Sequence, residues 1–149
     1  MQASAASNGP RREKGQVMGF REIPHTADVA LEVWAPDLVG LFAEAARGFN
    51  AVSGTQIASA PRLLRSVALS GIDAESLLVA YLTELVYAQE HDQLGFDEFN
   101  LQIVGQALSG ELGGARLISL TKPIKAITYH NLRINLTSRG YEVQIVFDV

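Results

Sequence analysis

The spacing of apolar residues changes along the chain, and this change restricts the fold more than any other feature. Apolar residues recur with helical spacing from Pro36 to about Gly54 and from Asp73 to about Gln93. Residues 28–34 instead alternate between apolar and polar, and the chain after the second helical segment is typical of β-strands. Two helices and about seven strands, joined mostly by short loops, predict an α+β fold with helices packed on a largely antiparallel sheet.

Local signals predict where these elements end. Asp73 is a favourable N-cap for the second helix. Residues 53–61 have the composition of a polar loop, and Gly113–Gly114 predicts a turn. The segment 126–136 alternates like a strand, and residues 137–140 predict a hairpin turn that leads to the last strand.

Composition limits the class of protein. The 149 residues, 48% of them hydrophobic and 19% charged, suit one globular domain, predicted here at 19–149 after a flexible tail at 1–18. There are no cysteines, which excludes disulfides, thiolate metal sites and cysteine nucleophiles.

Charge and hydropathy restrict the partners and the location. The formal net charge of −4, without a cluster of Lys and Arg in the predicted domain, argues against strong direct binding of nucleic acid. No apolar run approaches the roughly 20 residues that span a bilayer, so a membrane is not expected as a partner. The N-terminal segment has no apolar centre like that of a secretory signal, so the cytoplasm is the expected location.

Aspartate, which strands disfavour, occurs at the ends of two predicted strands. Asp28 begins the first of these, and Asp148 stands beside the α-carboxylate of Val149. Clustered carboxylates repel unless a proton or a cation lies among them, and Ca²⁺ and Mg²⁺ prefer oxygen ligands. These residues could bind such a cation if the two strands are neighbours. The alternatives are that Asp148 lies in solvent and that Asp28 caps a turn with His25 or Thr26.

Two further side chains are candidates for a binding site. His25 could be a ligand or a proton shuttle, or a turn residue after a proline. Lys125 could neutralise a carboxylate or contact a phosphate, or protect the edge of a sheet. The three histidines are scattered, which argues against zinc, and no nucleophile elbow, P-loop or dinucleotide fingerprint is present.

From Phe20 to Val149 the chain resembles the archease family. The resemblance is carried by five segments in the same order as in the family, namely PHTADVALEVWA, LVGLFAEAARGFNAV, IDAESLLVAYLTELVYAQE, KAITYHNLRI and VQIVFDV. Where many relatives have tryptophan in the second helix, this chain has Tyr81, which is predicted to be a substitution within the core.

The resemblance implies a small metal-binding α+β protein that acts as a cofactor of the GTP-dependent RNA ligase. Such proteins promote guanylylation and repeated turnover of the ligase in tRNA splicing and RNA repair, and they are not known as enzymes. The resemblance also implies a metal, typically calcium, bound by Asp28, Asp148 and the terminal carboxylate of Val149, with a functional role for Lys125 beside them.

Two other functions stay open at the level of the sequence. A small metal-dependent phosphohydrolase could use Asp28 and His25, but it would need an open coordination position and a substrate pocket. A chaperone-like binding module would instead use an exposed apolar surface and would need no metal.

Overall fold

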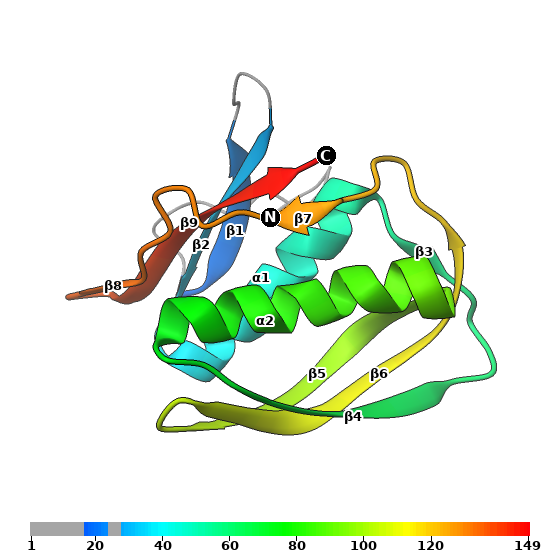
Figure 1. The fold of residues 1–149 in the computed structure, drawn as a ribbon, viewed down its shortest axis with the longest axis horizontal. Coiled ribbons are helices and arrows are strands. Elements are labelled where there is room, and N and C mark those ends of the chain that lie inside the picture. Colours follow the sequence, from blue (N-terminus) through cyan, green and yellow to red (C-terminus); the bar gives the residue numbers. More distant parts are fainter. Residues whose placement is uncertain (1–16, 24–27) are drawn as a thin grey trace.

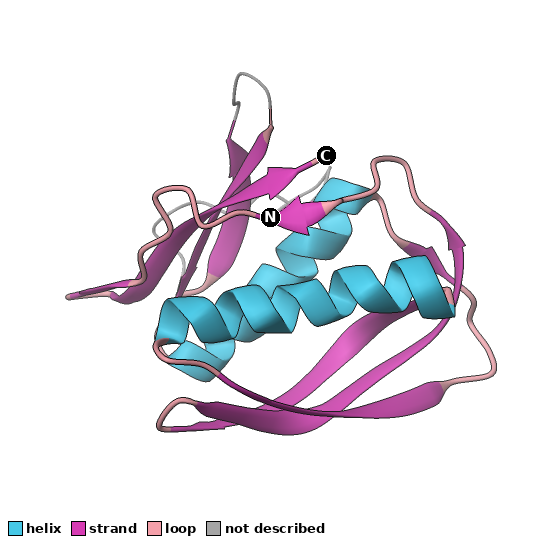
Figure 2. Ribbon diagram, in the orientation of Figure 1, coloured by secondary structure: helices cyan, strands magenta, loops and turns pink. Residues whose placement is uncertain are grey.

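The computed structural model describes residues 17–23 and 28–149, in which two antiparallel sheets lie on either side of two helices (Figure 1, Figure 2). The strands of the first sheet are, in spatial order, β1 (Gly19–Ile23), β2 (Val29–Ala35), β9 (Gly140–Asp148) and β7 (Ala126–Ile127), with β8 (Asn135–Thr137) also beside β9. The strands of the second sheet are β3 (Gln56–Ile57), β6 (Ala107–Ser119) and β4 (Leu63–Ser70), with β5 (Leu94–Val104) on the other side of β6.

The predicted α+β class is confirmed, and the arrangement of its strands differs from the prediction in two respects. The strands form two sheets instead of one, and the described residues contain nine strands instead of about seven. Strand β3 lies in a predicted loop, and β7 and β8 take the place of the single strand predicted at 126–136; all three are two or three residues long. Segments of this length are too short for an alternating pattern to identify them.

Both helices begin at the aspartates that the sequence provides. Helix α1 (Leu38–Ser53) follows Asp37, whose side chain accepts a hydrogen bond from the Gly40 N–H at 2.7 Å. It ends at Gly54, which has a φ of 66° and so adopts the left-handed conformation that glycine allows.

Helix α2 (Ala74–Tyr87) has the predicted cap at Asp73, which accepts from the Ser76 N–H at 2.7 Å. It continues into a short π-helix, η1 (Ala88–Asp92), and ends at Gln93 with a φ of 56°. None of the described helices is long and apolar enough to cross a membrane.

One hydrophobic core joins both sheets through the helix layer. It contains side chains from β2 and β9 above the helices and from β5 and β6 below them. Because α2 is covered on both sides, it is apolar around most of its circumference. The buried residues of α2 are Leu77, Leu78, Val79, Tyr81, Leu82, Leu85 and Val86.

The pair Gly113–Gly114 lies in the middle of β6, so the predicted turn is wrong. The turn between β5 and β6 is made by Gly105, with a φ of 61°, and by Gln106. A Cβ atom at Gly114 would come within 1.9 Å of the Gly95 backbone oxygen. Glycine therefore allows two strands to approach closely here, which the sequence alone does not distinguish from a turn.

Most of the predicted strand at 126–136 is irregular. Of this segment, only β7 and β8 pair with β9. Between these two short strands, the Ile134 N–H donates a hydrogen bond to Glu75 Oε2 at 2.9 Å. The predicted hairpin turn at 137–140 is confirmed, with the Thr137 hydroxyl donating to the Gly140 carbonyl at 3.1 Å. The predicted loop at 53–61 contains the short strand β3.

Tyr81 is fully buried, as expected for a substitution within the core. Its ring lies 5.6 Å from that of Phe42, and its hydroxyl has no hydrogen-bond partner within the described part of the chain. Burial raises the pKa of Tyr81 well above its ordinary value, so the hydroxyl is neutral.

Tyr81→Phe is expected to leave the free energy of unfolding unchanged or to raise it by about 1 kcal/mol. The substitution removes a buried donor that makes no compensating hydrogen bond and keeps the ring. Urea denaturation of both proteins measures the difference. A clear loss of stability in Tyr81→Phe would show that the hydroxyl has a partner.

Asp73→Ala is expected to lower the melting temperature at pH 7 by more than it does at pH 2.5. The Ser76 backbone N–H favours the ionised carboxylate and lowers the pKa of Asp73. The stabilisation is therefore complete above the unfolded pKa of about 3.9 and is lost as the pH falls through the lower folded value.

Thermal unfolding of both proteins at the two pH values measures this effect, with Asp73→Asn as the control. Asparagine keeps an oxygen acceptor for the helix N-terminus and does not titrate. An equal difference between wild type and Asp73→Ala at both pH values would contradict the ionic contribution of the cap.

Candidate metal centre

The register of β2 and β9 brings the two candidate aspartates together. These strands pair without a shift from Val29 opposite Phe147 to Ala35 opposite Tyr141. One step beyond Val29 and Phe147 are Asp28 and Asp148, so the predicted neighbourhood of the two strands is confirmed. Cross-strand partners in an antiparallel pair lie close together and point to the same face of the sheet.

That face is the outer one, away from the helices. Val29 and Phe147 belong to the hydrophobic core, and side chains alternate along a strand, so their neighbours Asp28 and Asp148 point outward. Asp148 is exposed and Asp28 is half-buried. Asp148 is thus carried by β9, whose other face is fixed in the core, and Asp28 directly precedes β2.

Strand β7 lies beside Asp148 on the side of β9 that faces away from β2. Ala126 pairs with Asp148, and the Lys125 N–H donates to the Asp148 carbonyl at 2.7 Å. The side chain of Val149 is partly buried against the core. The main chain on both sides of Asp148 is therefore held by its neighbours.

The backbone of Lys125 lies next to that of Asp148. Lys125 lies directly before β7 (Ala126–Ile127), and its side chain is exposed. The backbone of Lys125 therefore lies beside Asp148, as the resemblance implied.

The oxygen donors fit a hard cation and make an incomplete set. Asp28, Asp148 and the terminal carboxylate of Val149 supply only oxygen atoms, which are the ligands that Ca²⁺ and Mg²⁺ prefer. The described residues contain no group of three or more His, Cys, Asp or Glu side chains placed to hold a metal. Because Ca²⁺ takes six to eight oxygen ligands, water or a partner molecule would have to supply the others.

The histidines do not add a described ligand to this set. His25, like Thr26, lies outside the residues that the structure describes. His91 is in η1 and stacks on Tyr87 with 4.2 Å between ring centroids. The sequence predicted His130 within a strand at 126–136, and in the structure it lies in a turn after β7.

Two glutamates extend the acidic character of the same outer face. Glu32 and Glu142 line a cavity of about 150 Å³, together with Asn135, Val143 and Gln144. Arg21 pairs with Glu32 at 2.7 Å, and Arg139 pairs with Glu142 at 3.1 Å. These glutamates were not among the predicted site residues, although the alternation along β2 and β9 places Glu32 and Glu142 on the same face as Asp148.

Comparison with known proteins identifies similar chains over nearly the whole domain. The model of the archease protein family matches residues 20–149, which include both aspartates and Lys125. The protein archease of Methanosarcina barkeri is 33% identical over 141 residues, covering 87% of this chain and 95% of that protein. The protein archease of Archaeoglobus fulgidus is 33% identical over 138 residues, covering 89% and 100%.

Two solved structures have the same fold. The crystal structure of a Thermotoga maritima archease, described as a possible chaperone, has a TM-score of 0.65 and 18% identity, covering 87% of this chain and 96% of that one. The solution structure of Methanobacterium thermoautotrophicum protein 1598 has a TM-score of 0.65 and 20% identity, covering 88% and 99%. At identities of 18% and 20%, the similarity to these two structures shows the fold alone.

Proposed function

The chain belongs to the archease family, and from this premise we propose that it is a metal-binding protein cofactor of a GTP-dependent RNA ligase. Its role would be to promote guanylylation of the ligase and repeated turnover during tRNA splicing or RNA repair. The observation that supports the proposal is the register of β2 and β9, whose last pair, Val29 opposite Phe147, directly adjoins both Asp28 and Asp148.

Asp28 and Asp148 would bind Ca²⁺, or another hard cation such as Mg²⁺, through their carboxylate oxygens. The α-carboxylate of Val149 would add a third anionic group. When bound, the cation would supply positive charge for oxygen-rich phosphates or for carboxylates of the ligase. The coordination positions that this chain does not fill are where a partner's oxygen atoms could enter.

Lys125 is the proposed contact for the triphosphate or for an acidic side chain of the ligase. Its ammonium group is a compact charge on a flexible stem, and its backbone is fixed beside Asp148. His25, which lies outside the described residues, is proposed as a further contact for the ligase or its nucleotide. No residue is assigned as a nucleophile, so the protein acts through position and charge and is proposed not to be an enzyme.

The cytoplasm is the proposed location, because a ligase that uses GTP and RNA works there. RNA is proposed to contact mainly the ligase, since the net charge of this chain is −4. Acidic carboxylates on the outer face of the first sheet would repel a phosphate backbone in the absence of a cation.

A reconstituted ligation assay tests the proposal. Purified ligase is incubated with GTP, Mg²⁺ and RNA ends, with and without this chain, and covalent guanylylated ligase and joined RNA are followed with time. Stimulation of both signals, with more than one product per ligase, is expected. Absence of stimulation by the folded protein would reject the cofactor role.

The same preparation separates the two rival functions. Release of phosphate from simple phosphate esters by the isolated protein would favour a phosphohydrolase. Suppression of aggregation of unrelated unfolded proteins without added metal would favour a chaperone-like module. Neither result is expected if the protein acts on one ligase.

A further inference from the structure

Trp34, the single tryptophan of the chain, stands on the outer face of the first sheet and is nevertheless buried. Its neighbours in β2, Val33 and Ala35, belong to the hydrophobic core, so alternation turns Trp34 the other way. The helices lie on the inner face of this sheet (Figure 1). Trp34 is only 4% exposed. Flanking strands cover the sides of a large indole and not its outer end, so further chain must lie over it.

The shielding extends to the two acidic side chains beside Trp34. Glu142 pairs with Trp34 across β2 and β9, and Glu32 is two residues before it on the same face. Their side chains are 22% and 18% exposed, although they stand on the outer face. Gln144, the next outward residue along β9, is exposed. Trp34, Glu32 and Glu142 thus form one shielded patch, called the Trp34 patch below.

The chain before residue 17 joins the first sheet next to this patch. Gly19, the first residue of β1, pairs with Trp34 and has no side chain to cover the indole, and Met18 is packed against the core. The link between β1 and β2 starts after Ile23, which pairs with Ala30 at the opposite end of the two strands. Residues 1–16 are therefore tethered beside the Trp34 patch, whereas the β1–β2 link is not.

The segment PRREK at residues 10–14 has a charge that suits the patch. It carries three basic side chains and one acidic one. The outer face of the first sheet has the opposite balance, with three carboxylates on β2 and β9 against two arginines, namely Glu32, Glu142 and Asp148 against Arg21 and Arg139. Arginine also stacks on the face of an indole. The segment can therefore cover Trp34 and pair with its acidic neighbours at once.

The segment is also long enough to reach the patch. Residue 14 precedes Gly19 by five residues. Five extended residues span up to about 17 Å, whereas the two strand spacings from β1 to β9 add up to only about 10 Å. The basic side chains can therefore extend over both β2 and β9.

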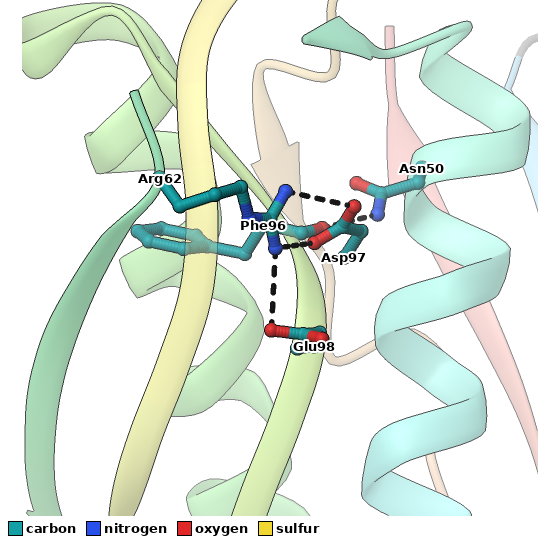
Figure 3. Close-up of polar contacts among 5 residues, drawn as sticks. All are labelled: Asn50, Arg62, Phe96, Asp97 and Glu98. Carbon is teal, nitrogen blue, oxygen red and sulfur yellow. Dashed lines mark hydrogen bonds and ion pairs between the residues drawn. The ribbon is translucent and has the colours of Figure 1, made fainter. Parts of the chain in front are cut away.

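Another acidic pair in the described chain is a poorer target for this segment. Asp97 and Glu98 are bridged by Arg62, which donates hydrogen bonds to them at 2.6 and 3.2 Å (Figure 3). They belong to β5 in the second sheet, which lies beyond the helices from Gly19. Their charge is thus already balanced, and a segment tethered at Gly19 meets the Trp34 patch first.

We propose that residues 10–14 fold back over the outer face of the first sheet, where Arg11 and Arg12 cover Trp34 and pair with Glu32 and Glu142. A carboxylate accepts several hydrogen bonds, so each glutamate can keep its present arginine partner and accept a second. A short tether gives the segment an effective concentration of about millimolar at the patch, so weak contacts suffice to hold it.

Docking of this segment leaves the candidate metal centre accessible. Asp148 is at the other end of β9 from Glu142 and is exposed. The proposal therefore does not rest on the proposed function, and its test needs neither calcium nor a ligase.

Tryptophan fluorescence tests the docking directly, because all of this signal comes from Trp34. Acrylamide, an uncharged quencher, measures how much of the indole meets solvent. In the full chain, weak quenching and the blue-shifted emission of a buried indole are expected. The variant Arg11→Glu/Arg12→Glu/Lys14→Glu should release the segment, because its acidic side chains would be repelled by the patch. Its quenching constant should rise several-fold, and its emission should shift to the red.

Two truncations serve as matched controls. Removal of residues 2–16 should expose Trp34 as the charge reversal does, whereas removal of residues 2–9, which carry no charge, should leave it shielded. Neither truncation removes part of a described strand or helix, and far-UV circular dichroism shows that the fold is kept.

Three results would overturn the proposal. The first is strong quenching of Trp34 in the full chain. The second is shielding that persists after the charge reversal. The third is shielding that is lost when the full chain is diluted, which would assign the cover to a second copy instead of to the chain's own residues 10–14.

Discussion

Asp148→Asn is expected to abolish calcium binding and, with it, stimulation of the ligase. The substitution keeps the shape of the side chain and removes the negative charge next to the Val29–Phe147 pair, where Asp28 also lies. Loss of a group that only supports a metal ligand already costs about 10- to 100-fold in affinity, so loss of a direct ligand should cost at least a hundredfold. Calorimetric titration with CaCl₂ and the guanylylation assay measure the two effects separately.

Asp28→Asn is expected to have the same two defects, since both carboxylates would bind the same ion. The control is Glu111→Gln, which makes the same chemical change at an exposed position on β6 in the other sheet. It should bind calcium and stimulate the ligase as wild type does.

Thermal unfolding shows whether a loss of calcium binding comes from a change at the site or from a loss of the fold. Without calcium, Asp148→Asn should melt at the same temperature as wild type or slightly higher, because repulsion between adjacent carboxylates is reduced. Calcium should raise the melting temperature of wild type and not that of the variant. Normal stimulation of the ligase by folded Asp148→Asn would contradict the proposed mechanism.

Phe147→Ala is expected to lower the free energy of unfolding by about 3–5 kcal/mol, a loss comparable to the total stability of many domains. Phe147 is fully buried in β9, and its ring lies edge-on to that of Phe49 with 6.2 Å between the centroids. The cavity left by alanine would lie under the strand that carries Asp148. Calcium affinity should therefore fall together with stability.

Urea denaturation of Phe147→Ala against wild type measures the loss. Gln144→Ala, at an exposed position of the same strand, is the matched control and should change stability by no more than about 0.5 kcal/mol. A loss below about 1 kcal/mol for Phe147→Ala would show that β9 is not anchored through this ring.

Local patterns in the sequence predicted the positions of helices and strands better than they predicted which strands pair. Helix caps such as Asp73 depend on neighbouring residues, and the alternation around Asp28 and Asp148 fixed which side chains share a face of each strand. The pairing of β2 with β9 joins segments more than a hundred residues apart, and no local pattern specifies such a contact. The expectation that these strands meet therefore depended on the family resemblance.

The predictions that the structure corrected also failed for physical reasons. Gly113 and Gly114 satisfy a turn pattern as well as a close approach of strands, and only the neighbouring backbone distinguishes the two. The separation of the strands into two sheets depends on α2 being covered from both sides, a property of packing and not of any single segment.

The position of β9 in the first sheet also determines when that sheet can close during synthesis. The strand lies between β2 and β7, yet it follows every other strand in the chain. On the ribosome, consecutive segments such as β5 and β6 can pair as soon as they emerge, whereas β2 must wait for β9. Until then the apolar β2 has no partner on that side, and a nascent chain would need shielding from aggregation. Capture of the cation would then be among the last events of maturation, available only to a molecule whose folding is finished.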